Sequence, residues 1–195
     1  FLIDSLRPGQ GLTMGNLLRR VLLGDIGGTA LTQVHIFGTT HEFSTIAGVR
    51  EDTLELLLNL KGIIIQNKSK EPQFGQLKVQ GPAIITANDI KLSSDATIIN
   101  PTHYLASIVN NKVLEIDFKF EYGTGYRLAN QLCIKEFSNL IEIDAIFMSV
   151  QKVDIKIEKN VSNPNKNTEQ LIINICTNGT ITPQDALLQS ANLIR

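Results

Sequence analysis

The stretch His41-Glu42-Phe43-Ser44 places a base, a carboxylate and a hydroxyl close together, as acid–base or nucleophilic catalysis would require. The surrounding residues 40–46 are predicted to form a strand. Neighbouring side chains of a strand point to opposite faces, so His41 and Glu42 could not act there as an acid–base pair. We therefore expect no catalysis by this stretch.

No spacing in the sequence suggests a metal, phosphate or cofactor site. The histidines, His35, His41 and His103, lack HxxxH spacing and have no accompanying cluster of acidic residues. The cysteines, Cys133 and Cys176, lack CxxC spacing, so we expect no disulfide framework or zinc site, and a reducing compartment fits. The sequence also lacks a P-loop, a GxSxG motif and a GxGxxG motif. It therefore predicts no catalytic residue, no metal ligand and no cofactor in this chain.

Two adjacent arginines, Arg19 and Arg20, belong to a predicted helix at residues 13–23, which the hydroxyl of Thr13 would cap. The apolar residues of this helix recur at helical spacing and form one stripe. They are Met14, Leu17, Leu18, Val21 and Leu22. At about 100° per residue, the two arginines project from the opposite side. Arginine makes forked bonds to carboxylates and carbonyls, so this face suits a protein partner, the alternative being an ordinary solvated face.

Two further helices are expected. The first, at residues 51–60, has acidic residues in its first turn and a stripe of Leu54, Leu57 and Leu58. The last begins at Thr182, whose hydroxyl would cap it, followed by proline and an acidic residue in the first turn. A small and apolar face follows on this last helix. It consists of Ala186, Leu187, Ser190, Leu193 and Ile194.

Short strands account for most of the remaining chain, because apolar and polar residues alternate there between turn signals. They are expected at residues 1–6, 29–37, 40–46, 63–66, 76–80, 83–86, 96–99, 113–122, 150–158 and 171–177. Residues 160–168 are polar and predict a loop. This order of elements predicts an α+β fold with a mainly antiparallel sheet.

The composition limits the size and partners of the protein, and the lack of active-site motifs favours a binding protein over an enzyme. The chain has 195 residues, 43% of them hydrophobic and 19% charged, which is enough for one large or two small domains. A net charge of −1 predicts no strong grip on DNA or on an anionic membrane. No apolar run reaches membrane-spanning length, and no signal peptide is visible. Since no active site is assembled, a binding subunit is the main hypothesis, and a stand-alone α+β small-molecule enzyme is the alternative.

Long segments of the sequence resemble the N-terminal domain of the α subunit of bacterial-type RNA polymerase. In chain order they are GQGLTMGNLLRRVLLGDIGGTALTQV, HEFSTIAGVREDTLELLLNLKGI, GPAIITANDI, GTGY, IDAIFMSV and TNGTITPQDALLQSANLI. The variants GQGLT, GTGY and IDAIFM are most similar to cyanobacterial and plastid α subunits. The resemblance therefore implies a location in the plastid (chloroplast) stroma, with a cyanobacterial cytoplasm as the alternative.

The resemblance implies a non-catalytic assembly platform in two parts. Residues 1–27 with 149–195 would form a discontinuous dimerisation subdomain, with helices on an antiparallel sheet, and residues 28–148 a mainly β insert that contacts the large subunits. The first and last helices would form the homodimer interface. Its implied residues are Met14, Leu17, Leu18, Val21, Leu22, Leu187, Ser190, Leu193 and Ile194.

The resemblance also implies contacts with two large subunits. Those implied for the β subunit are Arg19, Arg20, His41, Glu42, Phe43, Ser44 and Thr45, with Arg20 matching the critical arginine of the family's NxLRR motif. Those implied for the β′ subunit are Val150, Lys152 and Asp154. The complex would be a DNA-directed RNA polymerase, a nucleotidyltransferase, although this chain would carry none of its active-site residues. DNA would be met only indirectly, because the family's C-terminal DNA-binding domain is not among these residues.

The chain departs from the family at three turn positions. Gly27, Ala47 and Ser149 stand where the family often has proline, which alters the stiffness of the turns and not the inference. A homologous scaffold of the archaeal or nuclear type is a nearer alternative than an enzyme.

Overall fold

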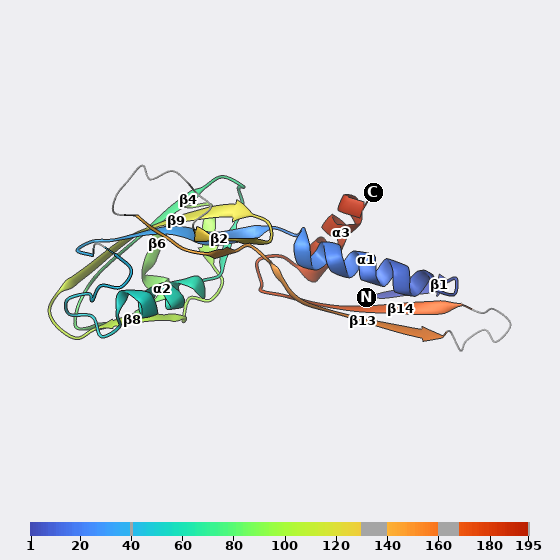
Figure 1. Ribbon diagram of the computed structural model, residues 1–195, viewed down its shortest axis with the longest axis horizontal. Coiled ribbons are helices and arrows are strands. Elements are labelled where there is room, and N and C mark those ends of the chain that lie inside the picture. The colour runs from blue at the N-terminus through green and yellow to red at the C-terminus, as the bar shows by residue number, and fades with distance from the viewer. Residues whose placement is uncertain (40, 130–139, 160–167, 195) are drawn as a thin grey trace. The chain divides into compact units, whose positions relative to one another are not determined.

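The computed structural model describes residues 1–39, 41–129, 140–159 and 168–194, and the chain forms two compact units. The first, here called the terminal unit, contains Phe1–Gly27 and Met148–Arg195. The second, the middle unit, contains Gly28–Phe147. Figure 1 shows the terminal unit in the blue and red ends of the colour scale and the middle unit mainly in the colours between them.

The terminal unit is a three-stranded antiparallel sheet, in the order β1-β14-β13, packed against helices. Its elements are β1 (Leu2–Leu6), α1 (Gln10–Gly24), β13 (Val150–Lys159), β14 (Glu169–Thr177) and α3 (Pro183–Ile194). Helix α1 lies along β13 and β14 and also packs against α3 (Figure 1). The core of this unit is small. It consists of Leu18, Leu22, Ile26, Val150, Val153, Leu171, Ile173 and Ala186.

Two glycines decide which face of α1 meets the sheet. A Cβ at Gly15 would lie 3.0 Å from Cδ1 of Leu171, and one at Gly11 would lie 3.4 Å from Cγ2 of Ile157. The helix approaches so closely at these positions that it buries Gly11, Gly15, Leu18 and Leu22. The predicted stripe is therefore divided: Leu18 and Leu22 are buried beside the two glycines, whereas Met14 and Leu17 are exposed. The sequence pattern did not show this division, because glycines do not count as apolar in it although they mark the closest approach.

The start of α1 also differs from the prediction. The helix begins at Gln10 with Gly9 as its N-cap, one turn before the predicted cap at Thr13. The hydroxyl of Thr13 instead donates to the carbonyl oxygen of Gly9 at 3.2 Å. The last helix begins as predicted, since the Thr182 hydroxyl accepts a hydrogen bond from the Asp185 N–H at 3.1 Å.

The middle unit is built on an antiparallel seven-stranded sheet in the order β6-β4-β9-β2-β3-β7, with β11 paired to β2. Its sheet strands are β2 (Gly28–Ile36), β3 (Ile65–Asn67), β4 (Gln73–Gln80), β6 (Ile90–Leu92), β7 (Ala96–Ile98), β9 (Val113–Gly123) and β11 (Ile141–Glu142). Its other elements are α2 (Thr53–Lys61), the pair β5 (Ala83–Thr86) and β8 (Tyr104–Ile108), the 3-10 turn η1 (Ala87–Asp89), and the pair β10 (Tyr126–Arg127) and β12 (Ala145–Ile146). The central strand β9 alternates as predicted, and its buried side chains are Leu114, Ile116, Phe118 and Phe120.

Helix α2 and the pair β5–β8 close the core of the middle unit. Leu56, Leu57 and Leu60 of α2 are buried in one cluster with side chains of the sheet and of β8. The predicted stripe of this helix is wrong at two positions, because Leu54 and Leu58 are 45% and 60% exposed. Five leucines within seven residues fit more than one helical face, and packing against the sheet selects one of them.

One predicted strand is wrong, and two other predicted features lie outside the described residues. No strand forms in residues 41–46, where the N–H of Ser44 donates to the His41 carbonyl oxygen and closes a turn. The predicted loop at residues 160–168 and Cys133 lie outside the described residues, except for Thr168. The α+β fold class with mainly antiparallel sheets is confirmed.

Candidate interaction surfaces

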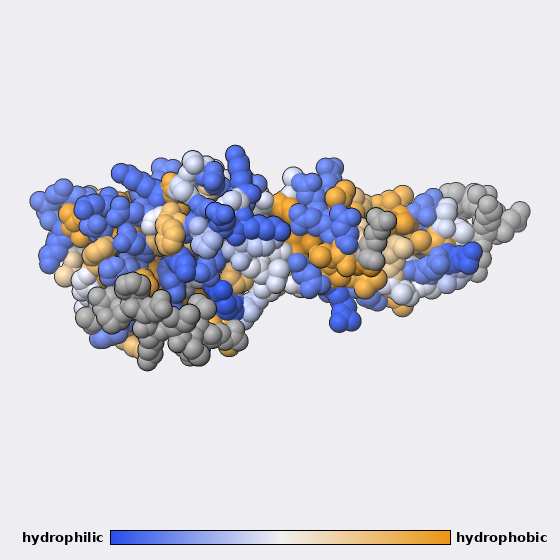
Figure 2. Space-filling view, turned by 90° about the horizontal axis from the view of Figure 1, so that it is seen from above, coloured by the Kyte–Doolittle hydropathy of each residue, from blue (hydrophilic) through white to orange (hydrophobic). Residues whose placement is uncertain are grey.

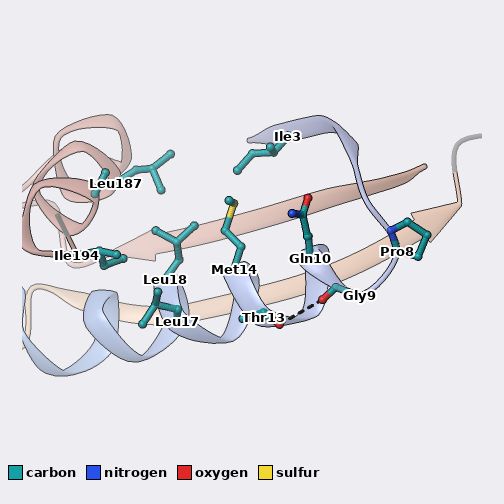
Figure 3. Close-up of a pocket in the computed structure, with 11 residues that line it drawn as sticks. Ile3, Pro8, Gly9, Gln10, Thr13, Met14, Leu17, Leu18, Leu187 and Ile194 are labelled. Atoms are coloured by element: carbon teal, nitrogen blue, oxygen red, sulfur yellow. Dashed lines mark hydrogen bonds between the residues drawn. The ribbon is translucent and has the colours of Figure 1, made fainter. Parts of the chain in front are cut away.

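An apolar groove of about 770 Å³ runs between α1 and α3 in the terminal unit. Figure 3 shows Met14, Leu18 and Leu187 pointing toward the same hollow. The groove is lined by Ile3, Pro8, Gly9, Gln10, Thr13, Met14, Leu17, Leu18, Leu187, Ala191 and Ile194. Figure 2 shows apolar side chains gathered over the helices of this unit. In an isolated chain this groove is exposed to solvent, and exposing so much apolar surface to water is unfavourable.

The residues predicted for a homodimer interface divide into an accessible and a buried group. Met14, Leu17, Leu193 and Ile194 are 39%, 45%, 60% and 37% exposed, while Val21 and Leu187 are half-buried and Leu18 is almost buried at the floor of the groove. Leu22 and Ser190 have no exposed surface. These two predictions need correction, because both side chains belong to the interior of their own chain. The hydroxyl of Ser190 donates to the carbonyl oxygen of Leu187 at 2.7 Å within α3.

The sequence did not identify several residues of the groove. Ile3 comes from β1, Pro8 from the turn before α1, Gln10 from the start of α1, and Ala191 from α3. Their contribution depends on the packing of three elements that are far apart in the chain. The sequence shows that Ile3 is apolar, but this does not distinguish a residue of a surface groove from a residue of the core.

The polar face of α1 presents free cations. Arg19 and Arg20 are exposed, and neither guanidinium has an ion-pair or hydrogen-bond partner among the described residues. A guanidinium keeps its charge at any physiological pH and offers a planar fork of donors. This face of α1 can therefore receive carboxylates or carbonyl groups of another molecule.

The segment 41–45 of the middle unit is an exposed turn. His41, Glu42 and Thr45 are exposed, and the Phe43 side chain is 75% exposed although it is large and apolar. Only Ser44 is partly covered, since its hydroxyl donates to the His41 carbonyl oxygen at 2.7 Å and lies 3.3 Å from the Thr53 hydroxyl. The turn therefore presents the side chains of His41, Glu42 and Phe43 to solvent.

A buried carboxylate fixes the chain directly after this turn. Glu51 is 5% exposed and accepts hydrogen bonds from the Ser107 N–H at 2.8 Å, the Ser107 hydroxyl at 3.2 Å and the Tyr104 hydroxyl. Burial by itself raises the pKa of Glu51, but the bonds from Tyr104 and Ser107 outweigh it and the pKa lies below its ordinary value. Burial and the neighbouring Glu51 raise the pKa of Tyr104. The prediction that placed Glu51 in the first turn of α2 is wrong, because Asp52 is the N-cap of that helix and accepts from the Glu55 N–H.

The outer face of β13 carries ion pairs. Lys152 and Asp154 are exposed and lie 2.8 Å apart, and Lys156 pairs with Glu158 in the same way further along the strand. The hydrogen bond that Lys152 donates to the Asp154 carboxylate raises the pKa of Lys152. Val150 is only 2% exposed and belongs to the core, so its predicted contact with a partner needs correction.

The described residues hold no group of three or more His, Cys, Asp or Glu side chains that could bind a metal ion. None of the helices in the described part of the chain has the length and apolar character needed to cross a membrane.

Comparisons with known proteins identify relatives of the whole chain. Residues 34–148 match the family described as the RNA polymerase Rpb3/RpoA insert domain. Proteins named DNA-directed RNA polymerase subunit alpha are similar over the entire chain: that of Phaeodactylum tricornutum is 57% identical over 194 residues, and that of Thalassiosira pseudonana is 57% identical over the same length. The protein of the same name from Porphyra purpurea is 46% identical over 194 residues. In each case the match covers 100% of this chain and 62% of the relative.

Proposed function

We propose that this chain, which belongs to the RNA polymerase α-subunit (Rpb3/RpoA) family, is a non-catalytic assembly subunit of a DNA-directed RNA polymerase. In this role two copies associate through the terminal unit, and the dimer binds the two large subunits, β and β′. The phosphodiester chemistry belongs to those large subunits. The relatives named above give no support to the alternative of a stand-alone small-molecule enzyme.

The apolar groove between α1 and α3 is the main observation that supports the proposed homodimer. Its exposed residues Met14, Leu17 and Ile194 are apolar, and its floor is Leu18, which also belongs to the core. A second copy offers the same apolar surface, so a two-fold arrangement covers both grooves at once. We therefore propose that the homodimer interface consists of the accessible residues Met14, Leu17, Val21, Leu187, Leu193 and Ile194 and of Leu18 at the floor of the groove, and we add Ile3 and Ala191 to them.

The exposed residues outside the groove are proposed to bind the large subunits. Arg19 and Arg20 lie on α1 outside the groove, and their guanidinium groups have no partner among the described residues, which supports their role in binding β. The exposed turn at residues 41–45 supports a second contact with β, with Phe43 as its apolar anchor. Lys152 and Asp154 on the outer face of β13 are assigned to β′. DNA is contacted only through the assembled complex.

The relatives support a plastid location. The ones named above come from algae and have a plastid origin, which supports our proposal that this protein acts in the plastid stroma.

The dimer is tested by size-exclusion chromatography with multi-angle light scattering on the chain. A mass of twice the 21.5 kDa monomer is expected, and a mass that stays at one chain at every concentration would contradict the proposal. Co-purification with tagged β and β′ tests the second part. A stable homodimer that recovers neither large subunit would refute the assembly role while leaving the dimer in place.

A further inference from the structure

Helix α1 begins without a side-chain cap and without a nearby negative charge from its own first turn. Its N-cap is Gly9, which has φ of 85° and no side chain to accept a hydrogen bond, and its first turn contains no acidic residue. The first N–H groups of a helix have no partner within the helix, and they carry the positive end of its dipole. The start of α1 therefore needs an acceptor, preferably a negative one, from elsewhere.

Glu169, the first residue of β14, supplies that acceptor. The Gly9 N–H donates to both carboxylate oxygens of Glu169, at 3.0 Å to Oε1 and 3.1 Å to Oε2. The same carboxylate lies against the first turn, since a Cβ built on Gly11 would be 3.1 Å from Oε2. One side chain that is 160 residues distant in the sequence thus provides both the acceptor and the negative charge that the helix lacks.

We propose that Glu169 is a positioning residue of the dimer groove. Gly9 lines one end of the groove together with its neighbours Pro8 and Gln10 (Figure 3). By holding Gly9 to β14, Glu169 sets where α1 begins and where this end of the groove lies. Glu169 does not itself line the groove, so its effect on dimerisation passes through α1. The inference rests on the proposed function, because it assigns Glu169 a role in the interface placed there.

The first test is Glu169→Ala, with Glu158→Ala as the matched control. Glu158 is also a glutamate near the same end of the sheet, but it pairs with Lys156 and forms no hydrogen bond or ion pair with the described residues of α1. Loss of a helix cap typically corresponds to about a 5-fold change in an equilibrium constant. We expect Glu169→Ala to speed amide exchange in the first turn of α1 and to weaken the dimer by about 5-fold, and Glu158→Ala to change neither.

A second variant separates positioning from general loss of stability. Leu12→Glu places a carboxylate within the first turn of α1 itself, where a negative charge is favourable, and Leu12 is exposed and does not line the groove. In the Glu169→Ala chain this substitution should recover most of the lost exchange protection and dimer affinity. In the chain that keeps Glu169 it should bring no gain, because two carboxylates then compete at one helix end. A defect that Leu12→Glu does not rescue would overturn the proposal.

The two readouts also distinguish this inference from the proposed function. Exchange in the first turn of α1 reports on Glu169 whether or not the chain dimerises. Unchanged exchange in Glu169→Ala would overturn the positioning role even if the wild-type chain is a dimer. Faster exchange with an unchanged dimer constant would refute the link to the groove. A wild-type chain that stays monomeric would refute the proposed dimer and, with it, the link between Glu169 and the interface.

Discussion

The two units differ in how each closes its core. In the middle unit, α2 and the pair β5–β8 cover one face of a seven-stranded sheet, and the side chains of that cluster are enclosed within the unit. In the terminal unit, three strands and two helices enclose a much smaller cluster. Leu18 belongs to that cluster and also lines the groove, so this core continues to the surface.

The two units differ in how many layers of secondary structure can cover their apolar faces. A sheet face or a helix stripe is stable only when another layer buries it, and small units bury a smaller share of their surface. Exposed apolar residues of the middle unit, such as Phe74 and Ile84, lie outside a core that is already closed. The terminal unit instead exposes apolar residues that are continuous with its core. We infer that the middle unit is complete by itself, whereas the terminal unit is completed by a partner.

The largest effect is expected from Leu17→Glu, which places a charge in the apolar groove. A buried, unpaired charge costs about 3–5 kcal/mol, so the dimer should dissociate into folded monomers. Leu12→Glu is the matched control, because Leu12 is on the same helix and 55% exposed but does not line the groove. Light scattering measures both. A Leu17→Glu dimer with unchanged affinity would show that the groove is not the interface.

The next largest effect is expected from Leu22→Ala, which truncates a buried side chain in the small core of the terminal unit. Leu22 has no exposed surface, and truncating a buried leucine costs about 2–5 kcal/mol of unfolding free energy. Amide exchange followed in urea should report this loss in α1, β13 and β14, with the middle unit unaffected. Leu188→Ala is the control, since Leu188 is 64% exposed. An equal loss in the middle unit would contradict the independence of the two cores.

Arg20→Ala should separate the polar face of α1 from the groove. Truncating one partner of a buried charge-assisted pair costs about 2–5 kcal/mol of binding free energy, so capture of the β subunit should weaken while the homodimer persists. Arg20→Lys should restore binding only in part, because lysine lacks the planar fork. Native mass measurement of the α2β complex tests this. Normal α2β yield with Arg20→Ala, or loss of the homodimer, would each contradict the assignment of this face.

A smaller and pH-dependent effect is expected at Glu51 in the middle unit. Removing one partner of a buried hydrogen bond costs about 1–3 kcal/mol, so Glu51→Gln should destabilise this unit at pH 7. The folded pKa lies below the ordinary value of 4.5, so the contribution is present above pH 4.5 and is lost as the pH falls through the folded pKa. Urea unfolding at pH 7 and in acid should therefore show a difference between Glu51→Gln and wild type that shrinks in acid. A difference that is constant with pH would exclude the ionised carboxylate as its source.

The smallest effect on folding is expected at the surface of β13. Lys152 and Asp154 are an exposed ion pair, and such pairs contribute little to stability. Lys152→Ala should leave the unfolding midpoint unchanged and reduce recovery of β′ by the assembled α2β complex. Lys156→Ala, which breaks the neighbouring pair, serves as the control. Equal β′ recovery by Lys152→Ala and wild type would remove this pair from the proposed interface.

The local sequence pattern predicted an element correctly where the pattern fitted only one structure. Strict alternation at residues 113–122 predicted β9 and its buried face, and the sequence from Thr182 to Asp185 predicted the start of α3. The antiparallel α+β class followed from the order of such elements. The long motifs of the chain also pointed to the family that its relatives support.

Only the tertiary structure decided which apolar faces are buried and which distant residues meet. Leucine-rich helices fit the period of 3.6 residues in more than one orientation, so the choice between Leu54 and Leu56, or between Leu17 and Leu22, came from packing against a sheet. The contacts from Glu169 to Gly9 and from Glu51 to Ser107 span 160 and 56 residues. No local spacing encodes them, because they exist only after separate strands and helices have packed together.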